Sequence, residues 1–141
     1  MRPVTLALLL ALAACSSSRA APTDGTATVV AVSDGDTIDV DFGGEVEPVR
    51  LLGIDTPETH HPTRPVECYG AEASARTAEL LPEGAAVHLV RDVEARDRYG
   101  RLLAYVYRAD DDLFVNRSLA EDGYADTLAI APNDAHAAEL A

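Results

Sequence analysis

Carboxylates and arginines gather in three short segments of this chain, each close to the end of an apolar run. The segments are Asp34-Gly35-Asp36-Thr37, the stretch from Arg50 to Thr59, and the stretch from Arg96 to Arg101. Taken alone, each has an ordinary explanation, namely a tight turn, a solvated strand end and a charged hairpin. Their residue types also suit phosphate chemistry, because carboxylate oxygens bind hard divalent cations and guanidinium groups bind phosphate through paired hydrogen bonds.

The middle segment is the most informative of the three. An apolar strand that begins with Arg50 runs directly into Asp55, Thr56 and Glu58. Carboxylates clustered where a strand opens into a loop suit a hard cation, which prefers oxygen ligands. In a continuous strand, even-numbered and odd-numbered residues point to opposite faces, so Arg50 and Asp55 are expected on opposite faces.

The apolar pattern around these segments predicts a β-rich α+β fold. Five runs read as strands, at residues 26–32, 37–41, 46–54, 86–90 and 102–107. Asp34-Gly35 is a strong hairpin signal between the first two strands, and Gly43-Gly44 marks the next turn. Helical spacing predicts helices over residues 71–81 and 115–122. This order predicts a five-stranded OB-type barrel with two to three helices, a fold often used to bind oligonucleotides.

In order and spacing, the three segments resemble the thermonuclease (staphylococcal nuclease-like) family. The resemblance rests on Asp-Gly-Asp-Thr at 34–37, Arg-Leu-Leu-Gly-Ile-Asp-Thr-Pro-Glu-Thr at 50–59 and Asp-Arg-Tyr-Gly-Arg at 97–101. Tyr-Gly-Ala-Glu-Ala-Ser at 69–74 is similar to the start of that family's first helix. The similarity runs from about Thr26 to His136, so we expect one nuclease-like domain over residues 26–141.

The resemblance implies a nuclease that depends on Ca²⁺ and hydrolyses both DNA and RNA to products ending in 3′-phosphate. Asp36 and Asp55 resemble the carboxylate ligands of the Ca²⁺ ion, and Thr56 resembles a ligand that binds through its backbone carbonyl. A metal in this position acts as a Lewis acid and as a template for the substrate.

The same resemblance implies roles for residues that contact the substrate. Glu58 resembles the residue that positions or deprotonates the attacking water, and Arg50 and Arg101 resemble the pair that grips the scissile phosphate. Arg64 stands where relatives often carry Lys near the substrate, and Tyr99 is expected to contact a base. These roles agree with the chemistry, because in-line attack on a phosphodiester builds negative charge that positioned arginines stabilise.

Two departures from the family pattern lie near the C-terminus. Relatives carry Tyr-x-Tyr before a Pro-Asn pair, whereas Ala129-Ile130-Ala131 precedes Pro132-Asn133 here. Tyr99 and Tyr124 are the aromatic candidates that remain, so we expect a weaker hold on the neighbouring base, since stacking contributes about 1–3 kcal/mol per base. The last helix is reduced to about 134–141, which is too short to be stable without packing.

The N-terminus is expected to direct export. Arg2 and a short apolar run make residues 1–14 a signal peptide, because the run is too short to span a bilayer. Leu12-Ala13-Ala14-Cys15 resembles a bacterial lipobox, which implies a lipid on Cys15 and a flexible tether over residues 15–25. We therefore expect an exported lipoprotein anchored to a membrane, periplasmic or at the cell surface. The alternative is a secreted protein whose ordinary signal peptide is cleaved at a later small residue.

The composition is strongly acidic. Against 24 Asp and Glu stand 11 basic residues, all of them arginine, for a formal net charge of −13. This excess argues against a protein that coats DNA passively, because basic side chains supply that affinity by neutralising phosphates. It leaves room for an enzyme with a local cationic site, since remote charges are screened over about 8 Å at physiological salt.

Two other classes of function remain open beside a monomeric nuclease. One is a catalytically inactive nuclease-like module that binds nucleic acid or a protein partner at the cell surface. Such modules lose part of the arginine and carboxylate set, and this chain keeps it. The other is a surface lipoprotein with a structural role, which only the acidity and the expected anchor favour.

Overall fold

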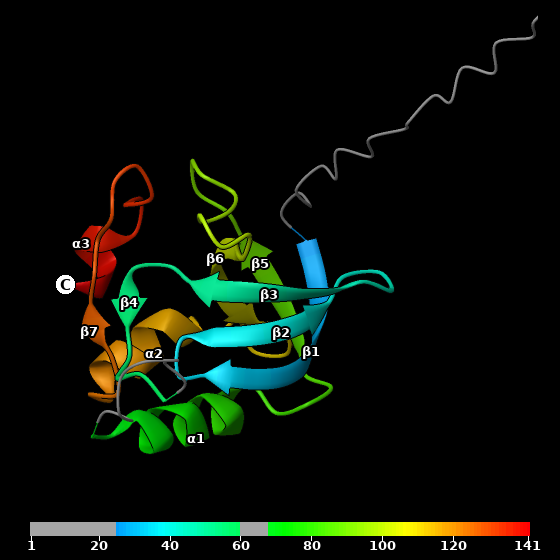
Figure 1. Ribbon diagram of the computed structural model, residues 1–141, viewed down its shortest axis with the longest axis horizontal. Helices are drawn as coiled ribbons and strands as arrows, with labels where there is room; N and C mark the ends of the chain where they lie inside the picture. The colour runs from blue at the N-terminus through cyan, green and yellow to red at the C-terminus, as the bar shows by residue number, and fades with distance from the viewer. Residues whose placement is uncertain (1–24, 60–67) are drawn as a thin grey trace, which may run out of the picture.

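The computed structural model describes residues 25–59 and 68–141. The expected signal peptide, Cys15 with its expected lipid, most of the tether and Arg64 lie outside the described residues, so what the sequence implies for them stays a prediction. Five strands form a closed barrel in the order β1-β2-β3-β6-β5 (Figure 1). They are β1 (Gly25–Asp34), β2 (Thr37–Asp41), β3 (Val46–Leu51), β5 (Ala86–Val90) and β6 (Leu102–Arg108).

The strand pairing confirms the predicted OB-type barrel. β1, β2 and β3 form an antiparallel meander, β5 pairs with both β1 and β6 in antiparallel fashion, and β3 closes the barrel against β6 in parallel. The interior is filled by fully buried side chains such as Ile38, Val40, Val49, Leu51 and Val106. Burial of one aliphatic side chain of this size contributes about 1.5–3 kcal/mol. Because the interior is a packed core, the functional side chains lie at strand ends and in loops.

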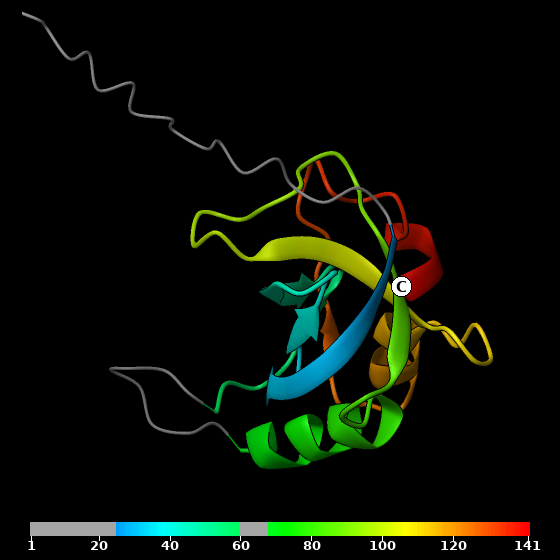
Figure 2. The same ribbon diagram turned by 90° about the vertical axis from the view of Figure 1, so that its right-hand side faces the viewer.

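In the described part of the chain, three helices pack around the barrel, which agrees with the two to three that the sequence predicted. They are α1 (Gly70–Leu80), α2 (Val115–Glu121) and α3 (Ala137–Leu140). α1 lies across one end of the barrel beside β1 (Figures 1 and 2). Buried Thr77 of α1 donates its hydroxyl to the carbonyl of Gly35 at 2.6 Å, which ties the helix to the turn between β1 and β2. Among the described residues, no helix has the length and apolar character required to cross a membrane.

The predicted third strand over 46–54 is wrong beyond Leu51. Leu52 and Gly53 form a turn there, and the chain continues as β4 (Ile54–Asp55), which pairs with β7 (Asp126–Thr127) outside the barrel. Gly53 has a φ of 77°, in the left-handed region that favours glycine. A Cβ added at Gly53 would also collide with the side chain of Leu140.

A buried amide fixes this turn against the barrel. The Asn116 side chain of α2 donates to the carbonyl of Leu52 at 2.8 Å and accepts from the backbone amide of Val106 at 2.9 Å. The amide of Leu52 in turn donates to the carbonyl of Ala104 at 2.9 Å. The turn therefore interrupts the alternation of a straight strand, so residues after Gly53 no longer point to the faces that their numbers would predict.

The C-terminal segment is shorter as a helix than the expected 134–141, because only Ala137–Leu140 is helical. Packing holds it, as predicted. Leu140 is buried, and the His136 ring lies on Tyr105 with ring centroids 4.3 Å apart. The Tyr105 hydroxyl donates to Asp92 at 3.1 Å. Burial raises the pKa of Tyr105 to about 12.

Candidate active site

A polar cavity of about 380 Å³ lies where the turn between β1 and β2 meets the end of β3 and the loop after β4. It is lined by Ser33, Asp34, Asp36, Thr37, Arg50, Asp55, Thr56, Glu58 and Arg101. The structure thus brings together all six described residues to which the family resemblance gives a catalytic or metal-binding role. They come from three segments of the chain, 34–37, 50–59 and 96–101, so only the closed barrel makes them neighbours.

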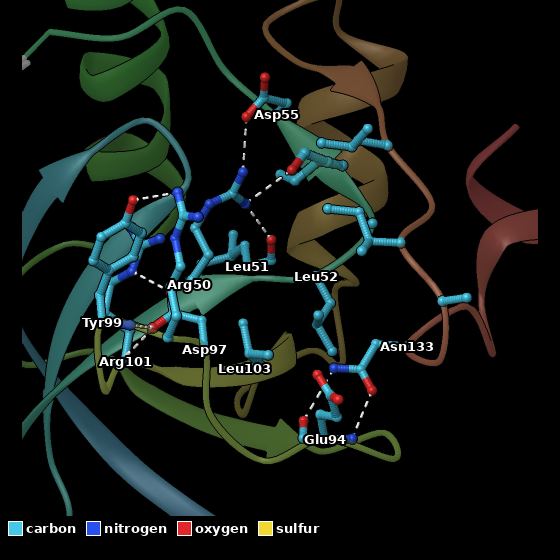
Figure 3. Close-up of a pocket in the computed structure, with 16 residues that line it drawn as sticks. Arg50, Leu51, Leu52, Asp55, Glu94, Asp97, Tyr99, Arg101, Leu103 and Asn133 are labelled. Atoms are coloured by element: carbon cyan, nitrogen blue, oxygen red, sulfur yellow. Dashed lines mark hydrogen bonds and ion pairs between the residues drawn. The ribbon is translucent and has the colours of Figure 1, made fainter.

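Arg50 lies at the centre of this cavity, with its side chain 16% exposed. Its Nη2 contacts Asp36 Oδ2 at 3.0 Å and Asp55 Oδ1 at 2.8 Å. Its Nη1 donates to the carbonyls of Leu51 and Ile54 at 2.5 and 2.8 Å (Figure 3). Arg50 and Asp55 were expected on opposite faces of a strand, and this prediction is wrong because the turn at Leu52-Gly53 brings Asp55 back beside Arg50.

Asp36 is held rigidly in the turn between β1 and β2. It is buried, and it accepts from the Thr37 hydroxyl at 3.0 Å and from the Thr56 backbone amide at 3.0 Å. The turn reaches Thr56 because residue 35 is glycine. A Cβ there would come within 2.6 Å of Thr56 Oγ1 and 2.9 Å of Ala73. A larger residue at 35 would therefore push Asp36 away from Thr56.

The two carboxylates suit a hard cation. Asp36 and Asp55 both contact Nη2 of Arg50, so the two carboxylates face one point and together attract positive charge there. Oxygen ligands are those that Ca²⁺ prefers. Within residues 25–59 and 68–141, no three His, Cys, Asp or Glu side chains are grouped for metal binding. The proposed role of the Thr56 carbonyl stays a prediction.

Glu58 is half-buried in the same cavity and is hydrogen-bonded to the side chain of Asp34. Asp34 Oδ1 also accepts from the Thr59 hydroxyl at 2.8 Å, the Gly35 amide at 2.9 Å and the Ser74 hydroxyl at 3.3 Å. Burial raises the pKa of Asp34, but the hydrogen bonds from Glu58, Thr59 and the backbone outweigh burial and lower it. Asp34 therefore links the loop that carries Glu58 to β1 and to α1.

Arg101 is oriented by Asp97. The Asp97 carboxylate accepts from Arg101 Nε at 2.7 Å and from the Arg101 backbone amide at 3.0 Å. Among the described residues, Nη2 of Arg101 has no hydrogen-bond partner. The guanidinium is also 5.5 Å from the centre of the Tyr99 ring. One edge of the guanidinium is therefore fixed by the protein, while the other remains available to a ligand.

The loop that carries Arg101 is anchored to the barrel through Arg96. Its Nη1 and Nη2 contact the two oxygens of buried Glu47 on β3 at 3.1 and 3.2 Å. Nη1 also donates to the carbonyl of Gly100 at 2.8 Å. Sequence reasoning assigned no role to Asp34 or Asp97. Their positions within Asp-Gly-Asp-Thr and Asp-Arg-Tyr-Gly-Arg were the signal that could have identified them.

A second cavity of about 550 Å³ adjoins the first and shares Arg50, Asp55 and Arg101 with it (Figure 3). Its remaining lining is largely apolar and includes Leu51, Leu52, Leu103, Leu128, Ile130 and Ala131. Tyr99 lies at this cavity and is 68% exposed, which fits its expected contact with a base. Tyr124 was the other aromatic candidate, but it packs against the barrel core and lines neither of the two cavities.

Comparison with known proteins gives one consistent family. The family model described as "Staphylococcal nuclease homologue" matches residues 48–141. A thermonuclease of Staphylococcus intermedius is 47% identical over 103 residues, which are 73% of this chain and 60% of that protein. A thermonuclease of Staphylococcus hyicus is 44% identical over 108 residues, 77% of this chain and 62% of that protein.

A third relative extends the comparison to another genus. The endonuclease YncB of Bacillus subtilis is 45% identical over 92 residues, 65% of this chain and 43% of that protein. The chain spans about three-fifths of the length of the two thermonucleases. The shared region includes the polar cavity, except for the turn between β1 and β2 where the family model does not reach.

Proposed function

Because the chain belongs to the staphylococcal nuclease family, we propose that it is a metal-dependent nuclease that acts as a monomer on DNA and RNA. The observation that supports this best is the convergence of Arg50, Arg101, Glu58 and the carboxylates of Asp36 and Asp55 on one cavity. Phosphodiester hydrolysis needs positive charge at the phosphoryl oxygens and an oriented water, and these side chains supply both.

Arg50 and Arg101 grip the scissile phosphate in this proposal. Both line the polar cavity and the adjoining apolar cavity, so a phosphate between them leaves its nucleoside beside the apolar walls. Guanidinium groups bind phosphate through two parallel hydrogen bonds, which a lysine ammonium cannot copy. Asp97 holds Arg101 by Nε and leaves Nη2 for the phosphate.

Glu58 orients the attacking water or accepts its proton. The oxygen of the water bonds to phosphorus, the bond from phosphorus to the 5′ oxygen breaks, and the leaving 5′ oxygen takes up a proton from solvent water to become a hydroxyl. The products then carry a 3′-phosphate and a 5′-hydroxyl. Asp34 holds the loop that carries Glu58 at the mouth of the cavity by accepting from the Thr59 hydroxyl at 2.8 Å.

The carboxylates of Asp36 and Asp55 and the backbone carbonyl of Thr56 are the proposed ligands of Ca²⁺. When bound, the cation supplies Lewis-acid stabilisation of the phosphoryl charge. Asp36 is fixed by Thr37 and Thr56, whereas the Asp55 side chain is 58% exposed and can adjust to the ion and the substrate.

Three protein ligands leave much of the shell of six to eight oxygens around Ca²⁺ to water and substrate. We therefore expect weak binding, with half-maximal activity at about 10⁻⁴–10⁻³ M Ca²⁺, as in extracellular calcium modules. Digestion of single-stranded DNA across a Ca²⁺ titration measures this. Excess chelator should stop digestion and added Ca²⁺ should restore it. Full activity in chelator would show that the metal assignment is wrong.

For the N-terminus we propose export, with residues 1–14 removed and Cys15 lipidated to hold the domain at a membrane. The wild-type protein should partition into the detergent phase, and Cys15→Ala should move it to the aqueous phase. Cys68→Ala is the matched control, because it removes the other cysteine, which is exposed in the folded domain. A mature N-terminus after residue 15, found by mass spectrometry, would refute the anchor.

A further inference from the structure

Glu94 is the one acidic side chain of the apolar cavity that lacks a partner within the described residues. The other two carboxylates that line this cavity are engaged, Asp97 by Arg101 and Asp55 by Arg50. Figure 3 places Glu94 at the end of the cavity away from Arg50 and Asp55, beyond Leu52 and Leu103. The Glu94 carboxylate is therefore separated by Leu52 and Leu103 from Arg50 and Arg101, the proposed phosphate-binding pair.

The backbone of Glu94 is fixed from the opposite wall. Asn133 is buried, and its side chain accepts from the Glu94 amide at 2.7 Å and donates to the Glu94 carbonyl at 3.0 Å. These two hydrogen bonds hold the main chain of Glu94 at the rim of the cavity (Figure 3). The Glu94 side chain thus extends from a backbone position that Asn133 fixes.

The Glu94 side chain is exposed at the rim of the cavity, where it can reach a molecule bound there. A substrate phosphate bound by Arg50 and Arg101 puts its own nucleoside over Leu52 and Leu103, because these residues line the same cavity. The edge of the base then faces Glu94. A carboxylate has only hydrogen-bond acceptors, so it repels a base that presents carbonyl oxygens and binds one that presents N–H donors.

We propose that Glu94 selects the base in this cavity, and that it favours bases with an amino group on the exposed edge over thymine and uracil. Guanine should be preferred most, because its neighbouring N1–H and N2–H donors match the two oxygens of one carboxylate. Cytosine and adenine follow, since each offers one amino group. The inference rests on the proposed nuclease function and adds a substrate preference to it.

Limited digestion of random-sequence single-stranded DNA, followed by sequencing of the fragment ends, tests the proposal with the full chain. One position beside the cut should show guanine over thymine on the order of tenfold, the discrimination expected of a good side-chain–base pair. Glu94→Gln should reduce this ratio to within about twofold, because glutamine offers both a donor and an acceptor on the same frame. The matched control is Glu83→Gln, which removes the same charge from an exposed residue outside both cavities.

The outcomes separate this inference from the nuclease proposal. Cleavage with equal base frequencies, or with thymine favoured, overturns the role of Glu94 and leaves the nuclease function standing. A guanine preference that persists in Glu94→Gln, or that is also lost in Glu83→Gln, overturns it as well. If the wild-type protein cleaves no nucleic acid with Ca²⁺ present, the proposed function fails and the inference fails with it. Loss of the preference in Glu94→Gln alone supports it.

Discussion

Glu58→Gln is expected to lower the turnover number on single-stranded DNA by about 10²–10⁴-fold, the usual contribution of a positioned acid or base. Glutamine keeps the shape of the side chain and an acceptor oxygen, but it cannot take a proton from water. Initial rates at saturating substrate and Ca²⁺ measure the effect. Glu72→Gln is the matched control, because Glu72 is exposed on α1 and lines neither cavity.

Comparison of Glu58→Gln with Glu58→Ala separates the two roles of this residue. If Glu58 only orients the water, glutamine should retain far more activity than alanine. If Glu58 removes the proton, both variants should lose activity alike, and the acidic limb of the pH–rate profile should disappear with them. A Glu58→Gln enzyme as active as Glu72→Gln would show that another residue handles the attacking water.

Arg101→Lys should lower turnover by about 10²–10³-fold, the range seen when one donor to a developing oxyanion is removed. The structure gives the reason. Asp97 accepts from Nε of Arg101 while Nη2 remains for the phosphate, and a single ammonium group cannot do both. Arg101 is a better test of phosphate binding than Arg50. Arg50 also donates to the carbonyls of Leu51 and Ile54, so a substitution there would disturb the turn as well.

Steady-state digestion of a short oligonucleotide measures the loss, with kcat and KM determined separately. Arg117→Lys is the matched control, because Arg117 lies on α2, pairs with Glu121 and Glu139, and lines neither cavity. Both variants should unfold at nearly the wild-type temperature. Wild-type turnover by Arg101→Lys would mean that the phosphate lies elsewhere.

Some site residues could be recognised from sequence, and others could not. Asp36, Asp55, Glu58 and the two arginines stood out because each belongs to a segment whose residue order is distinctive. Asp34 and Asp97 lay in the same segments but were missed, since their role is to hold Glu58 and Arg101 and this depends on contacts made after folding. Glu94 carried no local signal at all, because Asn133, whose side chain fixes the Glu94 backbone, is remote in the chain.

The sequence by itself determined the strands of the barrel, the helices α1 and α2 and the hairpin that carries Asp36. These features follow from side-chain alternation, helical spacing and turn residues, all of which act between near neighbours. Tertiary structure alone decided that β3 stops at Leu51 and that Asp55 returns to Arg50. The physical reason is that the left-handed turn at Gly53 is stabilised by groups far along the chain, namely the Asn116 side chain on the Leu52 carbonyl and the packing of Leu140.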